Sequence, residues 1–370
     1  MNRKRNTTLI GLAVVATLAT AACGSDDTKD SGSTGSNVAS STLDCDGAKD
    51  KLSAEGSSAQ KNAFDEFSAA YAAACSGDSI AYNPTGSGAG REQFIAKNVD
   101  FAGSDSALSE EEAPRARERC GGNDAWNLPV VFGPVALAYN LSGVDTLVLN
   151  ADVTAKIFTG AITNWNDPAI AALNSGTSLP DEKITPVYRS DKSGTSENFG
   201  LYLETAAAAS WDRGHDGTWQ GGAGEGAEKS AGVAEKVKTI AGSITYVEKG
   251  YADDLELTYA QVDNGSGPVE LTAETASASV DQAKFAGTGN DLKLDLASIY
   301  GTTEAGAYPI LLATYEIVCS QGYDAETAKA VKNFLTVAVN EGQDGLADIG
   351  YAPLPESFKT RLTTAIDAIA

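Results

Sequence analysis

Histidine is almost absent from this chain of 370 residues, in which His215 is the single example. The five cysteines form no Cys-x-x-Cys pair, so the sequence lacks the ligand spacings that zinc sites use. We therefore expect neither a metal site nor a cofactor. His215 lies in the polar run 213–218, where we expect a solvated loop residue.

Positive charge is also scarce, because 27 Lys and Arg residues stand against 50 Asp and Glu residues, which gives a formal net charge of −23. Nucleic-acid binding calls for basic patches, so we expect no nucleic-acid partner. The negative charge does not exclude an anionic ligand. A buried site is governed by local donors and dipoles more than by net charge.

The apolar run near the start of the chain, Leu9–Ala19, is too short to span a membrane. A positively charged segment precedes it and small residues follow it, which predicts a signal peptide over residues 1–22. Cys23 comes next, in a context that resembles a bacterial lipobox and implies lipidation (palmitate) at Cys23. Residues 23–46 are rich in Ser, Gly and Asp, so we expect a flexible tether that holds an exported chain at the cell membrane.

Four more cysteines remain in the exported chain: Cys45, Cys75, Cys120 and Cys319. An even number of cysteines outside the cytoplasm predicts two disulfides. Three pairings are possible, and the sequence by itself does not choose among them.

The order of the expected elements predicts an α/β fold. Short strands at 51–54, 80–82 and 99–102 are each followed by a Ser-bearing turn, and helical periodicity is clear over 59–74. Strands repeated with turns and helices favour a mostly parallel sheet, in which ligands bind at the carboxyl ends of the strands. Long apolar strands at 130–141 and 309–318 predict a chain that passes into a second domain and returns.

One stretch, Arg189–Ser196, carries the strongest chemical signal. Its Ser193-Gly194-Thr195-Ser196 turn at a helix start offers free backbone N–H groups and hydroxyls, the geometry that holds a small oxyanion. Arg189 can add a planar guanidinium. An ordinary helix N-cap with a surface arginine is the alternative interpretation.

The glycine-rich turn 85–90 has no nucleotide-binding or hydrolase signature. Arg91 stands where a dinucleotide fingerprint needs glycine, and neither the P-loop ending nor a nucleophile elbow is present. Taken by itself, this turn is a plain flexible loop.

Three segments resemble the ligand segments of phosphate-binding lipoproteins of the Pst ABC importer, the PstS family: 83–90, 99–105 and 189–195. The resemblance runs in order from about residue 50 to the C-terminus. It implies a type II periplasmic-binding-protein fold, α/β, with two lobes of mixed, mainly parallel sheets joined by two crossing strands. Lobe I would comprise residues 47–132 plus 309–370, and lobe II residues 133–308.

The resemblance also implies a phosphate-binding set drawn from both lobes, with Asp191 orienting Arg189. Ala59 would bind through its backbone, and the set as a whole is Ser58, Ala59, Ser87, Asp105, Arg189, Ser193, Gly194 and Thr195. Some members have a bulky residue followed by proline after the first serine, where this chain has Ala59-Gln60. Asp105 would accept the proton that phosphate retains and sulfate lacks.

The resemblance implies a monomeric solute-binding protein, not an enzyme, that delivers inorganic phosphate to the transmembrane permease subunits of an ABC importer. It would lie outside the cytoplasm, tied to the cell membrane only through a lipid anchor. The alternative is an exported phosphatase or other phosphate-ester hydrolase, disfavoured by the missing metal ligands and the lone histidine. A structural or adhesive envelope protein is a third interpretation.

Within this two-lobe arrangement we expect the disulfides Cys75–Cys120 and Cys45–Cys319. The first pair would join two segments of lobe I. The second pair would tie the N-terminal edge of that lobe to the returning strand.

Overall fold

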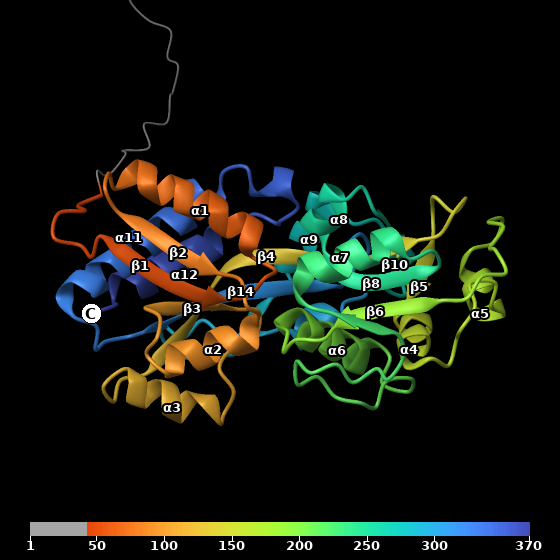
Figure 1. Cartoon of the computed structure of the whole chain (residues 1–370), viewed down its shortest axis with the longest axis horizontal. Coiled ribbons are helices and arrows are strands. Elements are labelled where there is room, and N and C mark those ends of the chain that lie inside the picture. Colours follow the sequence, from red (N-terminus) through yellow and green to blue (C-terminus); the bar gives the residue numbers. More distant parts are fainter. Residues whose placement is uncertain (1–42) are drawn as a thin grey trace, which may run out of the picture. The chain divides into compact units, whose positions relative to one another are not determined.

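A long mixed β-sheet runs through residues 43–370, the part of the chain that the computed structural model describes (Figure 1). The strand order is β2-β1-β3-β14-β4-β8-β6-β7, and β9 pairs with β4 off this path. The predicted signal peptide, Cys23 and residues 23–42 of the predicted tether lie outside the described residues. Within residues 43–370, no helix has both the length and the apolar character that a membrane crossing requires.

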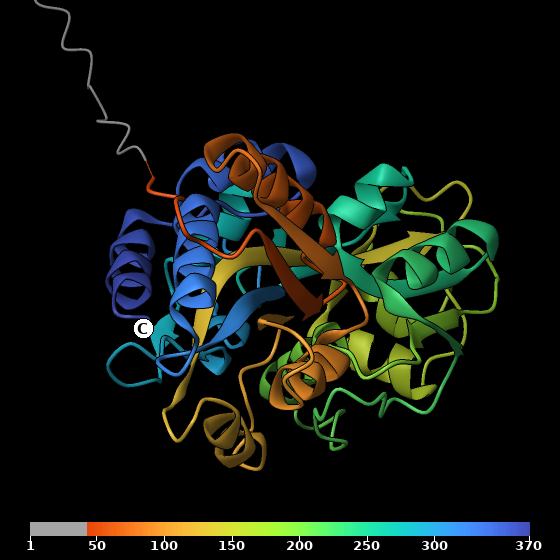
Figure 2. The same cartoon turned by 60° about the vertical axis from the view of Figure 1, so that its left-hand side comes forward.

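The first half of the sheet has parallel strands β1 (Lys51–Gly56), β2 (Ser79–Asn83) and β3 (Phe101–Ser104). Helices cover it on both sides, as Figures 1 and 2 show. They are α1 (Lys61–Ala74), α2 (Ser87–Ile95), α3 (Glu112–Arg119), α11 (Ala325–Val339) and α12 (Glu356–Asp367), with the short 3-10 helices η1 (Glu341–Gln343) and η2 (Leu346–Ile349).

The second half has parallel strands β6 (Thr185–Arg189), β7 (Glu225–Ala227) and β8 (Ser243–Glu248). Its helices are α4 (Ala151–Thr159), α5 (Pro168–Leu173), α6 (Gly194–Ala206), α7 (Lys229–Thr239), α8 (Lys249–Asp254), α9 (Ala273–Val280) and α10 (Ala297–Tyr300). Short strands complete it: β5 (Val148–Asn150), β9 (Thr258–Tyr259), β10 (Gln261–Asp263), β11 (Pro268–Val269), β12 (Lys284–Phe285) and β13 (Leu294–Asp295).

Two antiparallel strands, β4 (Ala125–Asn140) and β14 (Leu311–Cys319), join the halves. Residues 125–134 of β4 pair with β14, and residues 135–140 pair with β8 of the second half. Both strands are almost wholly buried, which explains why they read as long apolar runs. The predicted fold class, two α/β lobes joined by two crossing strands, is confirmed.

Each half has its own group of packed aromatic rings. In the first half, Phe64 of α1 packs against Phe101 and Phe334. In the second half, Tyr246 stacks with Phe199 and Trp219, whose ring centroids lie 4.4 Å and 5.4 Å away. Both aromatic groups belong to one hydrophobic core that is continuous through the two halves.

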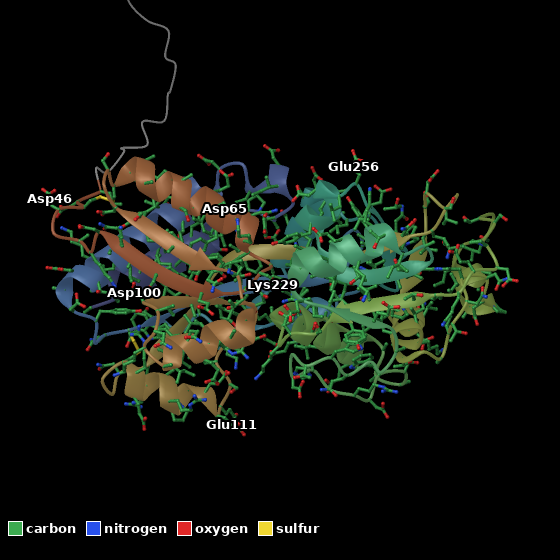
Figure 3. The ribbon with its side chains drawn as sticks, in the orientation of Figure 1. Asp46, Asp65, Asp100, Glu111, Lys229 and Glu256 are labelled. Carbon is green, nitrogen blue, oxygen red and sulfur yellow. A yellow bond between two sulfur atoms is a disulfide. The ribbon has the colours of Figure 1, made fainter. Side chains whose placement is uncertain are left out.

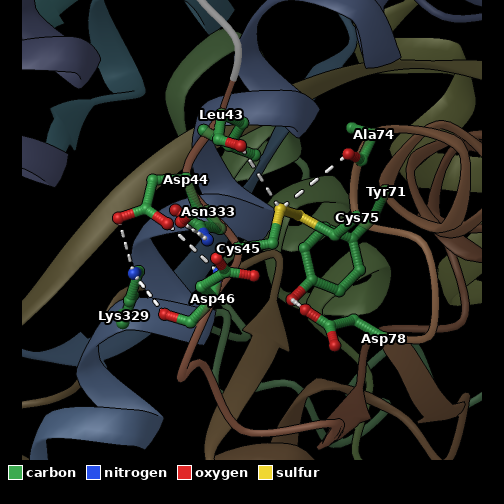
Figure 4. Close-up of a disulfide and its surroundings, with 10 residues drawn as sticks. All are labelled: Leu43, Asp44, Cys45, Asp46, Tyr71, Ala74, Cys75, Asp78, Lys329 and Asn333. Atoms are coloured by element: carbon green, nitrogen blue, oxygen red, sulfur yellow. Dashed lines mark hydrogen bonds and ion pairs between the residues drawn. A yellow bond between two sulfur atoms is a disulfide. The ribbon is translucent and has the colours of Figure 1, made fainter.

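The predicted disulfide pairing is wrong. The structure pairs Cys45 with Cys75 and Cys120 with Cys319, at Cα–Cα distances of 5.6 Å and 5.4 Å. Cys75 is the C-cap of α1, and Figure 4 shows the 43–46 segment lying against that end of the helix. Lys329 and Asn333 of α11 donate hydrogen bonds to Asp44 in this segment. The pairing of β14 with β4 places Cys319 opposite Ala125, close to the end of α3. The prediction relied on the lobe to which each cysteine was assigned. This assignment does not decide the pairing, because both observed disulfides join segments of the same half.

Candidate functional site

The residues predicted to bind an anion lie at the carboxyl ends of parallel strands in both halves. Ser58 and Ala59 follow β1, Ser87 follows β2, and Asp105 follows β3. Arg189 ends β6, residues 191–193 lead into α6, and Gly194 and Thr195 are the first residues of that helix. Every predicted ligand residue is buried, and Asp191 is partly buried. The structure therefore brings the whole predicted set to the junction of the two halves.

Asp105 is held by three hydroxyl groups. Ser57 Oγ and Thr314 Oγ1 donate to its Oδ1 at 2.6 Å and 2.7 Å, and Ser87 Oγ donates to its Oδ2 at 2.9 Å. Burial raises the pKa of Asp105, whereas the three hydroxyl donors and the charge of Arg189 act to lower it. Its Oδ2 accepts only one of these bonds and keeps a lone pair for a further donor.

Arg189 is buried and paired with Asp191. Its Nε donates to Asp191 Oδ1 at 2.7 Å, and its Nη2 donates to the other oxygen. The remaining nitrogen, Nη1, contacts the hydroxyls of Thr195 and Ser230 at 3.4 Å and 3.3 Å. Burial alone would raise the pKa of Asp191, but the bonds from Arg189 hold it below its usual value. Asp191 thus fixes the plane of the guanidinium.

A second contact locks Asp191 in place. Lys229, labelled in Figure 3, begins α7 with a left-handed φ of 63°. This conformation is uncommon for a residue with a side chain, and here its N–H donates to Asp191 Oδ1 at 3.0 Å. The same turn presents Ser230 to Arg189.

The α6 N-terminus has the predicted form. Ser193 is the N-cap, and its hydroxyl accepts from the Ser196 N–H at 3.2 Å. The first N–H groups of a helix have no partner inside it, and the helix dipole adds positive potential there. A Cβ at Gly194 would lie 2.5 Å from Ser87 Oγ and 2.6 Å from Asp105 Cβ, so the helix end meets the first half closely.

Several hydrogen bonds join the two halves around these residues. Asn198 Nδ2 of α6 donates to the Asp105 carbonyl at 2.7 Å, and the Ser230 N–H donates to Ser58 Oγ at 3.2 Å. The Gly88 N–H donates to the Lys192 carbonyl at 3.3 Å. The structure is therefore that of a closed cleft.

The first helix, α1, begins at Lys61 and not at residue 59 as predicted. Its N-cap is Gln60, which makes no side-chain capping bond. The Ala59 N–H donates to Ser57 Oγ at 3.0 Å, so this predicted donor is engaged within the turn. The following helix, α2, begins at Ser87, so this predicted ligand residue lies at a helix N-terminus.

Sequence reasoning missed four residues of the site: Ser57, Ser230, Glu248 and Thr314. Glu248 is buried, its Oε1 accepts from Thr195 Oγ1 at 2.6 Å, and burial raises its pKa. Ser230 could have been found as a serine at a helix start. Thr314 and Glu248 lie inside β-strands with no local signal.

The arrangement can hold a small tetrahedral oxyanion. Arg189, several hydroxyls and helix N-termini supply donors, while Asp105 supplies an acceptor for a ligand that carries a proton. Among residues 43–370, the one group with metal-like spacing is Cys45, Cys75 and Asp78. Its two sulfurs are joined in a disulfide, which leaves no thiolate for a metal.

Comparisons with known proteins place the chain in a family. Residues 31–341 match the model of the PBP superfamily domain. Phosphate-binding protein PstS3 of Mycobacterium bovis is 46% identical over 363 residues, which cover 98% of each chain. Phosphate-binding protein PstS of Xylella fastidiosa is 34% identical over 314 residues, which cover 83% of this chain and 82% of that protein.

Solved structures agree on the fold. The phosphate-binding protein from Stenotrophomonas maltophilia superposes with a TM-score of 0.65 at 21% identity, over 85% of this chain and 94% of that chain. At this identity the likeness establishes the fold alone.

Proposed function

Because the chain belongs to the PstS family of phosphate-binding proteins, we propose that it captures inorganic phosphate in the cleft and delivers it to the permease subunits of an ABC importer. The near-complete coverage of relatives at 46% identity supports this proposal over the hydrolase alternative.

The observation that carries the proposal is a buried carboxylate among anion donors. Asp105 faces Ser87 and the α6 N-terminus, where an anion finds N–H groups, hydroxyls and Arg189. A carboxylate beside an anion is tolerable only with a proton between them. Phosphate keeps a P–OH group at neutral pH, and that group can donate to Asp105 Oδ2.

We assign the other ligand roles in the same way. Arg189 Nη1, Thr195 and the first amides of α6 would bind from the second half, and Ser58 and Ser87 from the first. Asp191 would orient Arg189. Each charge-assisted hydrogen bond contributes about 1.5–3 kcal/mol, so several together offset the dehydration of the anion.

The remaining assignments concern the chain as a whole. We propose that Cys23 carries a lipid anchor, that the protein acts as a monomer outside the cytoplasm, and that it catalyses no reaction. The lobes would comprise residues 47–132 plus 309–370 and residues 133–308. Metabolic labelling with palmitate, abolished by Cys23→Ser, would test the anchor.

Calorimetric titration of the phosphate-stripped chain tests the central proposal. We expect saturable binding of phosphate with a 1:1 stoichiometry and no measurable binding of sulfate. Absence of phosphate binding, or release of phosphate from p-nitrophenyl phosphate by the purified chain, would contradict it.

A further inference from the structure

Behind the candidate site lies a second buried acid. Glu316 of β14 is fully buried, and within residues 43–370 neither of its carboxyl oxygens has a hydrogen-bond partner. Gln60 is equally buried, and its Oε1 also lacks a partner there. Leaving a buried polar atom unpaired destabilises the folded state, so three such atoms need a physical explanation.

The sheet register brings these two side chains together. Glu316 lies opposite Gly103 of β3, and cross-strand partners point to the same face of a sheet. A Cβ at Gly103 would lie 1.9 Å from Gln60 Nε2 and 2.8 Å from the Tyr82 hydroxyl. Gln60 and Tyr82 therefore cover the position that Glu316 faces.

The orientation of the Gln60 amide follows from its other contact. Tyr82 has one hydroxyl proton, which it donates to the Ser57 carbonyl at 2.6 Å. The Tyr82 oxygen must then accept from Gln60 Nε2, 3.0 Å away. Gln60 Oε1 is consequently turned from Tyr82 and needs a donor. A carboxylate at Glu316 could only accept, whereas a carboxylic acid could donate.

We propose that Glu316 is a neutral carboxylic acid that donates to Gln60 Oε1 and thereby positions the Ser57–Asp105 contact in the phosphate site. This inference rests on the proposed function of that site. Gln60 Nε2 donates a hydrogen bond to the Tyr82 hydroxyl, and that hydroxyl donates to the Ser57 carbonyl. Ser57 Oγ in turn donates to Asp105. Thr314, two residues before Glu316 on the same face of β14, donates to the same Asp105 oxygen.

The charges around Glu316 agree with a neutral acid. The pKa of Glu316 is raised to about 8, mainly by burial and also by the negative charge of Asp105, while the Gln60 side chain acts to lower it. The titratable groups that face it are Asp105, which follows β3, and Tyr82 of β2, whose pKa burial holds well above its usual value. No Lys or Arg of residues 43–370 contributes to this balance. Glu316 is therefore protonated at pH 7 and ionises as the pH rises through about 8.

Ionisation of Glu316 disfavours an anion in the site, because it places a second carboxylate behind Asp105. Phosphate affinity of the parent protein should therefore fall by about tenfold or more between pH 7 and pH 9.5, beyond the fall caused by the other groups. Glu316→Gln keeps a neutral donor of the same shape. We expect it to retain the affinity of the parent at pH 7 and to lose this extra fall.

Two further variants distinguish the effect of the Glu316 charge from the effect of its hydrogen bond to Gln60. Glu66→Gln removes an exposed carboxylate and should keep the pH profile of the parent. Glu316→Met is neutral but cannot donate to Gln60, so we expect weaker phosphate binding at pH 7 together with the flat profile of Glu316→Gln. Equal pH profiles in the parent and Glu316→Gln would overturn the proposal.

A measurement without phosphate tests the proton directly. In infrared difference spectra of the parent against Glu316→Gln, we expect a protonated-carboxyl band at pH 7 that disappears by pH 9.5. Absence of the band at pH 7 overturns the proposal. If the band is present but the protein does not bind phosphate, the proposed function is refuted, whereas the protonation of Glu316 is established.

Discussion

Asp105 combines two properties that rarely occur together, a buried carboxylate and an anion-binding neighbourhood. We expect Asp105→Asn to lose selectivity more than affinity, because an amide can still bond phosphate and can also donate to sulfate. Sites that rely on a hydrogen-bond partner reject ligands lacking it by about 10⁴–10⁵-fold. Titration of both proteins with both anions at pH 7 measures this, and continued exclusion of sulfate by the variant would show that another residue discriminates.

Arg189 and Lys192 offer a matched pair of basic residues in one turn. Arg189 is 2% exposed and bonded to Asp191, Thr195 and Ser230, whereas Lys192 is exposed. Arg189→Ala should weaken phosphate binding by about 2–5 kcal/mol, the cost of removing a buried charged partner. Lys192→Ala should cost about 1 kcal/mol or less. Equal dissociation constants in calorimetry would mean that Arg189 is not the ligand.

The sequence by itself points to residues with a local signal, whereas Ser58, Ser87 and Asp105 were predicted from the family resemblance. Arg189, Asp191 and Ser193 occupy one turn, and Ser193 caps α6 as expected. Thr314 could not be found in this way. It donates a hydrogen bond to Asp105, which is 209 residues away in the sequence, and within its own segment it is a typical strand residue. Glu248 likewise meets Thr195 across 53 residues.

At the scale of elements, the α6 N-terminus closes the cleft only because residue 194 has no side chain. The Cβ of Gly194→Ala would lie 2.5 Å from Ser87 Oγ, so closure should cost about 1–3 kcal/mol and phosphate affinity should fall about tenfold to a hundredfold. Thermal unfolding without phosphate should change little, because the clash arises only where the halves meet.

Gly232→Ala in α7 is the matched control. Its Cβ would meet only Ala227, at 3.7 Å, which is ordinary van der Waals contact. Phosphate affinity should be unchanged in this variant. Parent-like affinity in Gly194→Ala would show that the closed contact seen here is not formed with phosphate bound.

Long elements were predictable and short ones were not. The helix expected at 59–74 is found as α1, which begins two residues later, at Lys61, and both crossing strands were expected to within five residues at each end. The sequence of residues 261–290 carries no clear strand pattern, since the strands found there, β10, β11 and β12, are two or three residues long. Elements of that length are defined by their partners, and their own sequence carries too little periodicity to reveal them.

For the whole molecule, the two disulfides close loops of very different length. Cys120 and Cys319 are 199 residues apart, and Cys45 and Cys75 are 30 apart. In the chain-entropy model, replacing Cys120 and Cys319 with alanine should lower the free energy of unfolding by about 5 kcal/mol. Replacing Cys45 and Cys75 with alanine should lower it by about 3.5 kcal/mol. Urea denaturation of both double variants measures the order. A larger loss for the 30-residue loop would show that native contacts near α1 outweigh loop closure.

In the part of the chain that the structure describes, the cleft has one buried arginine, Arg189, and three carboxylates, Asp105, Asp191 and Glu248. The positive charge of the cleft is therefore already balanced by its own acidic groups. Acidic side chains such as Asp46, Asp65, Glu111 and Glu256 project from the outside of both halves (Figure 3), in a chain of net charge −23. A free phosphate ion is therefore repelled on its way in and held only after it arrives. Its association rate should rise with ionic strength, because salt screens that repulsion over about 10 Å at 0.1 M. Stopped-flow mixing over a range of KCl concentrations would show this acceleration, which is opposite in sign to that of proteins whose open positive clefts attract their anions.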